Sequence, residues 1–130
     1  MGISLKKEDD MKINFEDFLI IKTTEERIKK VGSLYDATHY RWKAKIENLE
    51  KYHYVLAVIK GYVKDVFVVD YWQPAKNRYG ENGEGRCEFV GQLALDEIRK
   101  YFIGKRIPEI YRKQGMANPV LFPKKEARWD

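Results

Sequence analysis

The chain of 130 residues has the length of a single domain, and 44% of its residues are hydrophobic, enough to build a core. No apolar run approaches the ~20 residues of a membrane-spanning helix, so we expect a soluble, cytoplasmic protein without a membrane partner. A single cysteine, Cys87, excludes an intrachain disulfide framework. The net charge of +5 favours an anionic partner such as nucleic acid, or else indicates only a solvated basic surface.

The first part of the chain predicts a leader, a strand and two capped helices. Residues 1–12 are rich in charge, and we expect a mobile leader there, a single domain over 13–123 and a C-terminal tail over 124–130. The apolar run 18–21 predicts the first strand. Thr24 and Ser33 are the expected N-caps of two helices, of which the first ends at Gly32 and the second covers 34–41.

A long hairpin is the strongest pattern in the chain. It is preceded by an extended segment over 41–45 and a helical turn over 46–51. Two runs rich in β-branched and aromatic residues, 54–59 and 62–72, then flank the step Lys60-Gly61, which predicts a hairpin at the centre of a sheet. The first arm is apolar almost throughout and should be buried on both faces.

The second half predicts a loop, two strands and one helix. Residues 75–85 are polar and glycine-rich, and we interpret them as an exposed, flexible hairpin loop because they lack the Gly-Lys-Ser/Thr of a phosphate-binding loop. A strand over 87–93 and a helix over 95–103, with Asp96 as its cap, should follow. A basic turn over 110–115 and a strand over 120–122 complete the prediction.

Catalytic and metal-binding patterns are missing from the sequence. Cys87, His39 and His53 fit no zinc-site spacing, and we expect no metal and no other cofactor. Cys87 lies in an apolar strand, so a buried core thiol is a better interpretation than a nucleophile. No catalytic residue is assigned, and a non-catalytic protein is favoured.

Aromatic and basic residues occur together on both sides of the hairpin. Aromatic side chains stack on bases for about 1–3 kcal/mol each, and Lys and Arg bind phosphates through a salt-sensitive term. For either tryptophan alone, packing in the core is the favoured alternative. The residues concerned are Tyr40, Arg41, Trp42 and Lys43 before the hairpin and Tyr71 and Trp72 after it.

The order of elements over residues 18–72 resembles the PUA-like superfamily, and by pattern its EVE and ASCH domains. The similarity rests on the strand 18–22, the segment Arg41-Trp42-Lys43, the turn Asn48-Leu49 and the two strands over 54–60 and 61–69. It implies an α+β fold: a small, mixed, partly closed β-barrel of five to six strands, with two or three helices between strands. The Gly-Asp pair that often precedes the second strand of EVE domains is replaced here by Tyr52-His53.

The resemblance also implies a function. Many such domains bind RNA or DNA, and EVE domains hold a modified base in an aromatic pocket. If this transfers, Arg41, Trp42, Lys43 and Asn48 line the pocket and Tyr71 and Trp72 form its rim. The leading hypothesis is a non-catalytic nucleic-acid-binding module. The alternatives are a protein-interaction module that uses loop 76–85 or turn 110–115, and an enzyme acting on RNA or a nucleotide.

Overall fold

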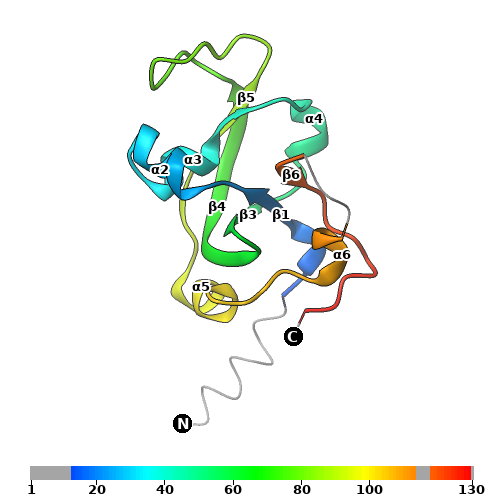
Figure 1. The fold of residues 1–130 in the computed structure, drawn as a ribbon. Coiled ribbons are helices and arrows are strands. Elements are labelled where there is room, and N and C mark those ends of the chain that lie inside the picture. Colours follow the sequence, from blue (N-terminus) through cyan, green and yellow to red (C-terminus); the bar gives the residue numbers. More distant parts are fainter. Residues whose placement is uncertain (1–12, 114–117, 130) are drawn as a thin grey trace.

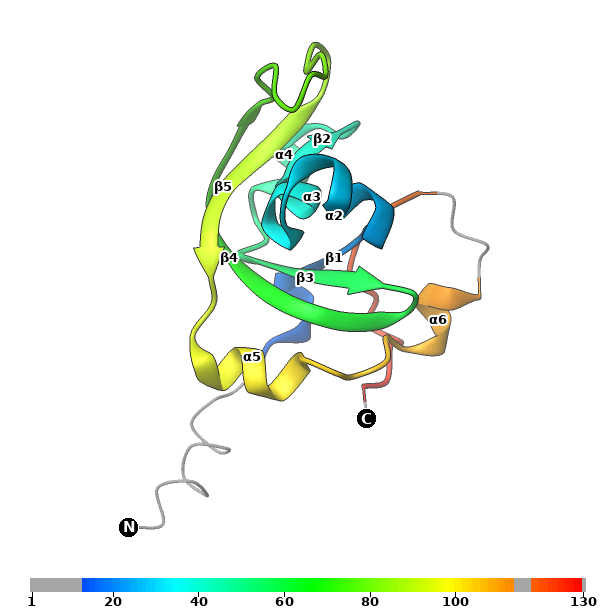
Figure 2. The ribbon, with the colours of Figure 1, turned by 60° about the vertical axis from the view of Figure 1, so that its left-hand side comes forward.

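The computed structural model describes residues 13–113 and 118–129, and the predicted leader over 1–12 lies outside them (Figure 1). Six strands in the described part form one mixed sheet in the order β2-β5-β4-β3-β1-β6, in which only β1 and β3 pair in parallel. Figure 2 shows how the sheet curls into a nearly closed barrel. The strands are β1 (Phe18–Lys22), β2 (Tyr40–Trp42), β3 (Tyr54–Ile59), β4 (Tyr62–Pro74), β5 (Cys87–Leu93) and β6 (Val120–Leu121).

Five α-helices connect these strands, and a short 3₁₀ turn, η1 (Phe15–Asp17), precedes β1. The predicted α+β, partly closed barrel is confirmed, with more helices than the two or three expected. No helix among the described residues is both long and apolar enough to cross a membrane. The helices are α2 (Glu25–Val31), α3 (Leu34–His39), α4 (Ile46–Leu49), α5 (Asp96–Phe102) and α6 (Glu109–Arg112).

The predicted hairpin is formed by β3 and β4. Ile59 pairs with Tyr62 across the two-residue turn Lys60-Gly61, and both turn residues have positive φ, 52° and 85°, as a type I′ turn requires. Residues 55–59 are all buried, because β3 lies between two strands and has a core on each face. The expected burial of the first arm on both faces is therefore confirmed.

Two hydrophobic cores lie on opposite faces of the sheet. Alternate residues of β1 enter them: Phe18 and Ile20 pack with Phe102 of α5, whereas Leu19 and Ile21 pack with Leu49 of α4. We call these the α5 core and the α4 core. Near the C-terminus, the Trp129 ring lies parallel to Phe15, with centroids 5.9 Å apart, and adds to the α5 core.

The helix caps agree with the sequence in two cases and differ in one. The Thr24 hydroxyl accepts a hydrogen bond from the Arg27 amide, and the Ser33 hydroxyl accepts one from the Asp36 amide, each at 3.0 Å. Asp96 does not cap α5: Leu95 holds the cap position without a side-chain bond, and Asp96 is the first helical residue. Its charge still lies near the positive end of the helix dipole.

Candidate functional site

The barrel is open between its two edge strands, β2 and β6, and a cavity of about 390 Å³ lies at this gap. We call it the seam cleft. Its walls come from the end of β1, the start of α2, β2, the loop before β5 and the segment entering β6. The lining residues are Lys22, Thr23, Thr24, Arg27, Tyr40, Arg41, Trp42, Lys43, Glu81, Arg86, Asn118, Pro119 and Val120.

The seam cleft is strongly cationic. It contains five Lys or Arg side chains and a single carboxylate, a net charge of +4 against +5 for the whole chain. That carboxylate, Glu81, accepts hydrogen bonds of 2.7 Å from both terminal nitrogens of Arg27 and one of 3.0 Å from Lys30. The two hydrogen bonds from Arg27, together with the one from Lys30, lower the pKa of Glu81 to about 2.

Three cations of the cleft are left for a ligand. Arg41, Lys43 and Arg86 form no ion pair with any described carboxylate. Lys43 is exposed, and Arg41 and Arg86 are partly exposed. A cleft with unpaired cations attracts anions, because its low-dielectric walls concentrate the field.

Arg41 is held by an irregular strand. The pairing of β2 with β5 shifts register between Tyr40 and Trp42, and Arg41 has a φ of 83°, in the left-handed region that a side chain rarely adopts. Its Nε donates to the Asn82 carbonyl at 2.8 Å. Because this bond uses only Nε, the two terminal nitrogens of the guanidinium remain as donors.

Trp42 joins the cleft to the α4 core. Its indole Nε1 donates to the Thr38 carbonyl at 2.8 Å, and the half-buried ring packs beside the α4 core while also lining the cleft. The ring is thus fixed by packing and by a hydrogen bond before any ligand arrives. An aromatic side chain oriented in this way loses little conformational entropy on stacking.

The structure brings together half of the predicted site residues. Arg41, Trp42 and Lys43 line the seam cleft, whereas the predicted rim residues after the hairpin do not. Asn48 is exposed on α4 and Tyr71 is 54% exposed on β4, both outside the cleft lining. Trp72 is only 7% exposed and packs in the α4 core, the placement that was favoured for either tryptophan considered alone.

Sequence reasoning did not identify Lys22, Arg27, Glu81 and Arg86 as site residues. Lys22 ends β1 and Arg86 directly precedes β5, so each lies where a strand meets the cleft. A cation at a strand end was the only available signal, and it is common to many strands. The pairing of β2 with β5 and of β1 with β6 is what places these residues around one space.

The loop over 75–86 is exposed at half of its residues, as expected of a surface loop, but it is also bonded to the barrel, which corrects its interpretation as a flexible loop. Tyr79 and Gly80 form a turn with positive φ, 55° and 74°, closed by two backbone hydrogen bonds between Arg78 and Glu81. Gly83 is buried, and a Cβ there would lie 2.5 Å from the Lys76 carbonyl oxygen. The expectation that glycine serves the turn geometry is supported at this position.

A buried ion pair holds the base of this loop. Glu88 is completely buried and accepts hydrogen bonds from Nε and Nη2 of Arg78, at 2.8 and 2.9 Å, and from Gln73 at 2.6 Å. Burial raises the pKa of Glu88, but the hydrogen bonds from Arg78 and Gln73 outweigh it and the pKa is lowered. Glu88 is therefore ionised and positions the loop that supplies Glu81 and Arg86.

A second polar chain connects the loop to α3. The Tyr79 hydroxyl donates to Asp36 at 2.7 Å and lies 2.8 Å from Nε2 of His39, whose Nδ1 lies 3.0 Å from the Phe89 carbonyl. Burial lowers the pKa of His39, so the neutral ring is favoured. Because the Phe89 carbonyl can only accept, Nδ1 carries the ring proton and Nε2 is an acceptor, so the single hydroxyl proton of Tyr79 serves either Asp36 or Nε2 of His39 at any one time. These side chains are explained by attachment of the loop rather than by a reaction.

The remaining candidate chemistry is accounted for by packing. Cys87 is a buried thiol, as expected, and contacts the carbonyls of Trp42 and Ala44; burial raises its pKa to about 11. In residues 13–113 and 118–129, no group of three or more His, Cys, Asp or Glu side chains is placed to hold a metal ion.

Comparison with family models, curated proteins and solved structures found no match to this chain.

Proposed function

We propose that the protein is a nucleic-acid-binding module whose seam cleft receives an unpaired segment of RNA or DNA. Trp42 stacks on one unstacked base, while Arg41, Lys43 and Arg86 bind the neighbouring phosphates. The observation that carries the proposal is the combination of a fixed tryptophan and a net charge of +4 in one open cavity.

The cleft is better suited to binding than to acid–base chemistry. Its only carboxylate, Glu81, has a pKa of about 2 and already accepts three hydrogen bonds from Arg27 and Lys30. Such a group is a weak proton acceptor near neutral pH, where a general base is most effective with a pKa close to 7. This favours a binding module over an enzyme acting on RNA or a nucleotide.

The PUA-like resemblance, which rests on sequence pattern, adds the proposal that the stacked base is a modified one. The partly closed barrel supports it, since the aromatic residue and the cations gather where the barrel is open. A protein-interaction role through loop 76–85 receives less support, because buried polar contacts at Glu88 and Tyr79 explain how that loop is held.

Fluorescence anisotropy with labelled single-stranded RNA and DNA tests the proposal. Oligonucleotides with and without base modifications are titrated at 50 and 200 mM salt. We expect Trp42→Ala to weaken binding by about 1–3 kcal/mol, roughly 5- to 150-fold. Lys43→Ala should weaken binding and lower the slope of log affinity against log salt by roughly 0.7, the value for one phosphate on a single strand.

Two variants outside the cleft provide matched controls. Tyr71→Ala removes an exposed aromatic ring, and Lys64→Ala removes an exposed cation of β4. Neither should change the affinity or the salt slope beyond experimental error. If no oligonucleotide binds at 50 mM salt, or if Tyr71→Ala weakens binding as much as Trp42→Ala, the proposed use of the seam cleft is wrong.

A further inference from the structure

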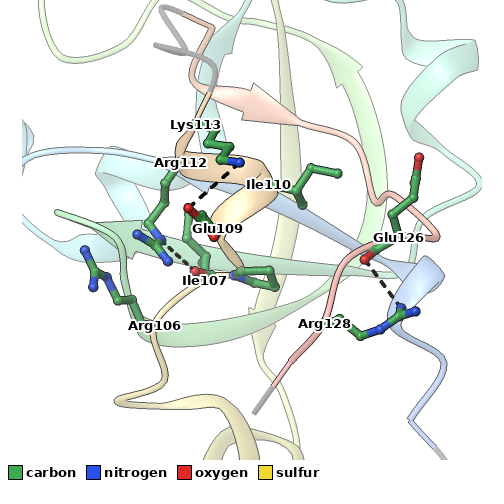
Figure 3. Close-up of a pocket in the computed structure, with 9 residues that line it drawn as sticks. Arg106, Ile107, Glu109, Ile110, Arg112, Lys113, Glu126 and Arg128 are labelled. Atoms are coloured by element: carbon green, nitrogen blue, oxygen red, sulfur yellow. Dashed lines mark hydrogen bonds and ion pairs between the residues drawn. The ribbon is translucent and has the colours of Figure 1, made fainter.

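A second cationic cavity lies beside α6, with a volume of about 610 Å³ (Figure 3). We call it the α6 cavity. Four cations and two carboxylates line it, a net charge of +2, together with the apolar residues Ile107, Pro108 and Ile110. No aromatic ring is among the lining residues. Its charged residues are Arg106, Glu109, Arg112, Lys113, Glu126 and Arg128.

The arginines of the α6 cavity are bound to backbone or ring atoms instead of carboxylates. Nε of Arg112 donates to the Ile107 carbonyl at 3.0 Å, and Arg128 donates to the Glu126 carbonyl at 3.4 Å, both drawn in Figure 3. Arg106 lies over the Tyr62 ring, 5.9 Å from its centroid. None of the three forms an ion pair with a described carboxylate, so their charges are not neutralised.

The chain itself limits the distance between the two cavities. Lys113 lines the α6 cavity and Asn118 lines the seam cleft, and only five peptide units separate them. Since consecutive Cα atoms are about 3.8 Å apart, the Cα atoms of Lys113 and Asn118 are at most about 19 Å from each other. At the ~3.4 Å per nucleotide of a stacked strand, that upper limit corresponds to at most about six nucleotides.

We infer that the α6 cavity is a second phosphate-binding subsite for the same strand of RNA or DNA that enters the seam cleft. This inference rests on the proposed function of the seam cleft. The two cavities have different roles in this arrangement. The seam cleft stacks on a base, whereas the α6 cavity, which is lined by cations without an aromatic ring, binds the phosphate backbone and does not distinguish between bases. A strand spanning both cavities covers a number of nucleotides within the usual range of about 4–16 for a small single-strand-binding barrel.

Strand length provides the test. Binding of a trinucleotide, chosen as too short to cover both cavities in full, is compared with binding of a twelve-nucleotide strand at 50 and 200 mM salt. The wild-type protein should bind the longer strand more tightly and with a steeper salt slope. The double variant Arg112→Gln/Arg128→Gln should weaken the twelve-nucleotide complex roughly tenfold, as expected for two lost exposed ion pairs, and lower its salt slope by roughly 1.4. Trinucleotide affinity should not change.

Controls separate charge from folding. Lys64→Gln/Lys100→Gln removes the same charge from exposed positions on β4 and α5, outside both cavities, and should leave both complexes unchanged. Arg112→Lys/Arg128→Lys keeps the charge and should restore most of the salt slope. Thermal unfolding of each variant identifies any that fail to fold. If the double variant does not fold, the single variants Arg112→Gln and Arg128→Gln carry the comparison, and each should lower the salt slope of the twelve-nucleotide complex by roughly 0.7.

The outcomes distinguish this inference from the proposed function. If Arg112→Gln/Arg128→Gln leaves the twelve-nucleotide complex unchanged, or weakens both complexes equally, the second subsite is wrong while the seam cleft stands. If Lys43→Ala and Trp42→Ala have no effect on the trinucleotide, the proposed function is wrong, and the inferred continuous strand is wrong with it.

Discussion

The seam cleft and the α6 cavity are both cationic, but their walls are held in different ways. Around the seam cleft, the buried Glu88 and the Tyr79 hydroxyl attach the loop over 75–86, and Trp42 is fixed by a hydrogen bond to Thr38. The charged side chains that line the α6 cavity are all exposed, and they lie on α6, on the residues directly beside it and near the C-terminus. From this difference we expect that charge alone would select an anion, whereas a preorganised aromatic face would be needed to select a base.

Removing Glu88 should have the largest effect, because this residue holds the loop that forms one wall of the seam cleft. Glu88→Ala leaves Arg78 without its partner and removes the anchor of the loop. We expect the free energy of unfolding to fall by about 3 kcal/mol, the lower end of the range for breaking a buried ion pair, because Arg78 is 35% exposed and reaches water. Urea denaturation measures the loss.

A double-mutant cycle with Arg78→Leu and Glu88→Leu provides the control for that prediction. The double variant should lose less stability than the sum of the two single variants, because no unpaired charge remains buried. Additive losses would show that Glu88 acts independently of Arg78.

Gly83→Ala should have the next largest effect. The added Cβ would lie 2.5 Å from the Lys76 carbonyl oxygen and 2.6 Å from that of Ala75, and backbone atoms can move only with the loop. We expect a loss of about 2 kcal/mol in the free energy of unfolding, together with weaker trinucleotide binding. Gly85→Ala has open space around the new Cβ and a positive φ, so its cost should be about 1 kcal/mol. Equal losses in the two variants would contradict the steric argument.

The smallest effect concerns acid stability. The pKa of Glu81 is about 2 in the folded protein and close to its usual value of 4.5 when unfolded. Between these values the unfolded chain binds the proton more readily, so the stabilisation from Glu81 is complete above about pH 4.5 and is lost as the pH falls toward 2. The stability difference between wild type and Glu81→Gln should therefore shrink over this interval in urea denaturation.

The α6 cavity provides the control for the acid-stability prediction. Glu109 is 67% exposed and lies 4.0 Å from Lys113, so Glu109→Gln should change stability little at any pH. A wild-type to Glu81→Gln difference that stays constant from pH 5 to pH 2.5 would show that the ion pair with Arg27 does not stabilise the fold.

Much of the fold could be predicted because its signals lie within a few residues of one another. The turn Lys60-Gly61, the caps Thr24 and Ser33 and the apolar run of β3 each depend on local backbone geometry and on the alternation of side chains along a strand. The loop over 75–86 was predicted to be exposed, which holds for half of its residues, but its bonds to the barrel were missed because its polar residues are typical of flexible loops. Their partners Asp36, His39 and Arg27 are 40 to 54 residues away in the chain.

The two tryptophans beside the hairpin illustrate which features follow from the local sequence and which depend on the packing of distant segments. Composition and pattern identified a basic, aromatic segment at 41–43, and the resemblance to PUA-like domains implied an α+β barrel. They did not distinguish Trp42, on the edge strand β2, from Trp72, which pairs with Phe89 and is buried in the α4 core. Burial depends on which strands pair and where the sheet ends. The seam cleft exists because β2 and β6 are left as edges, a consequence of pairings between residues far apart in the chain.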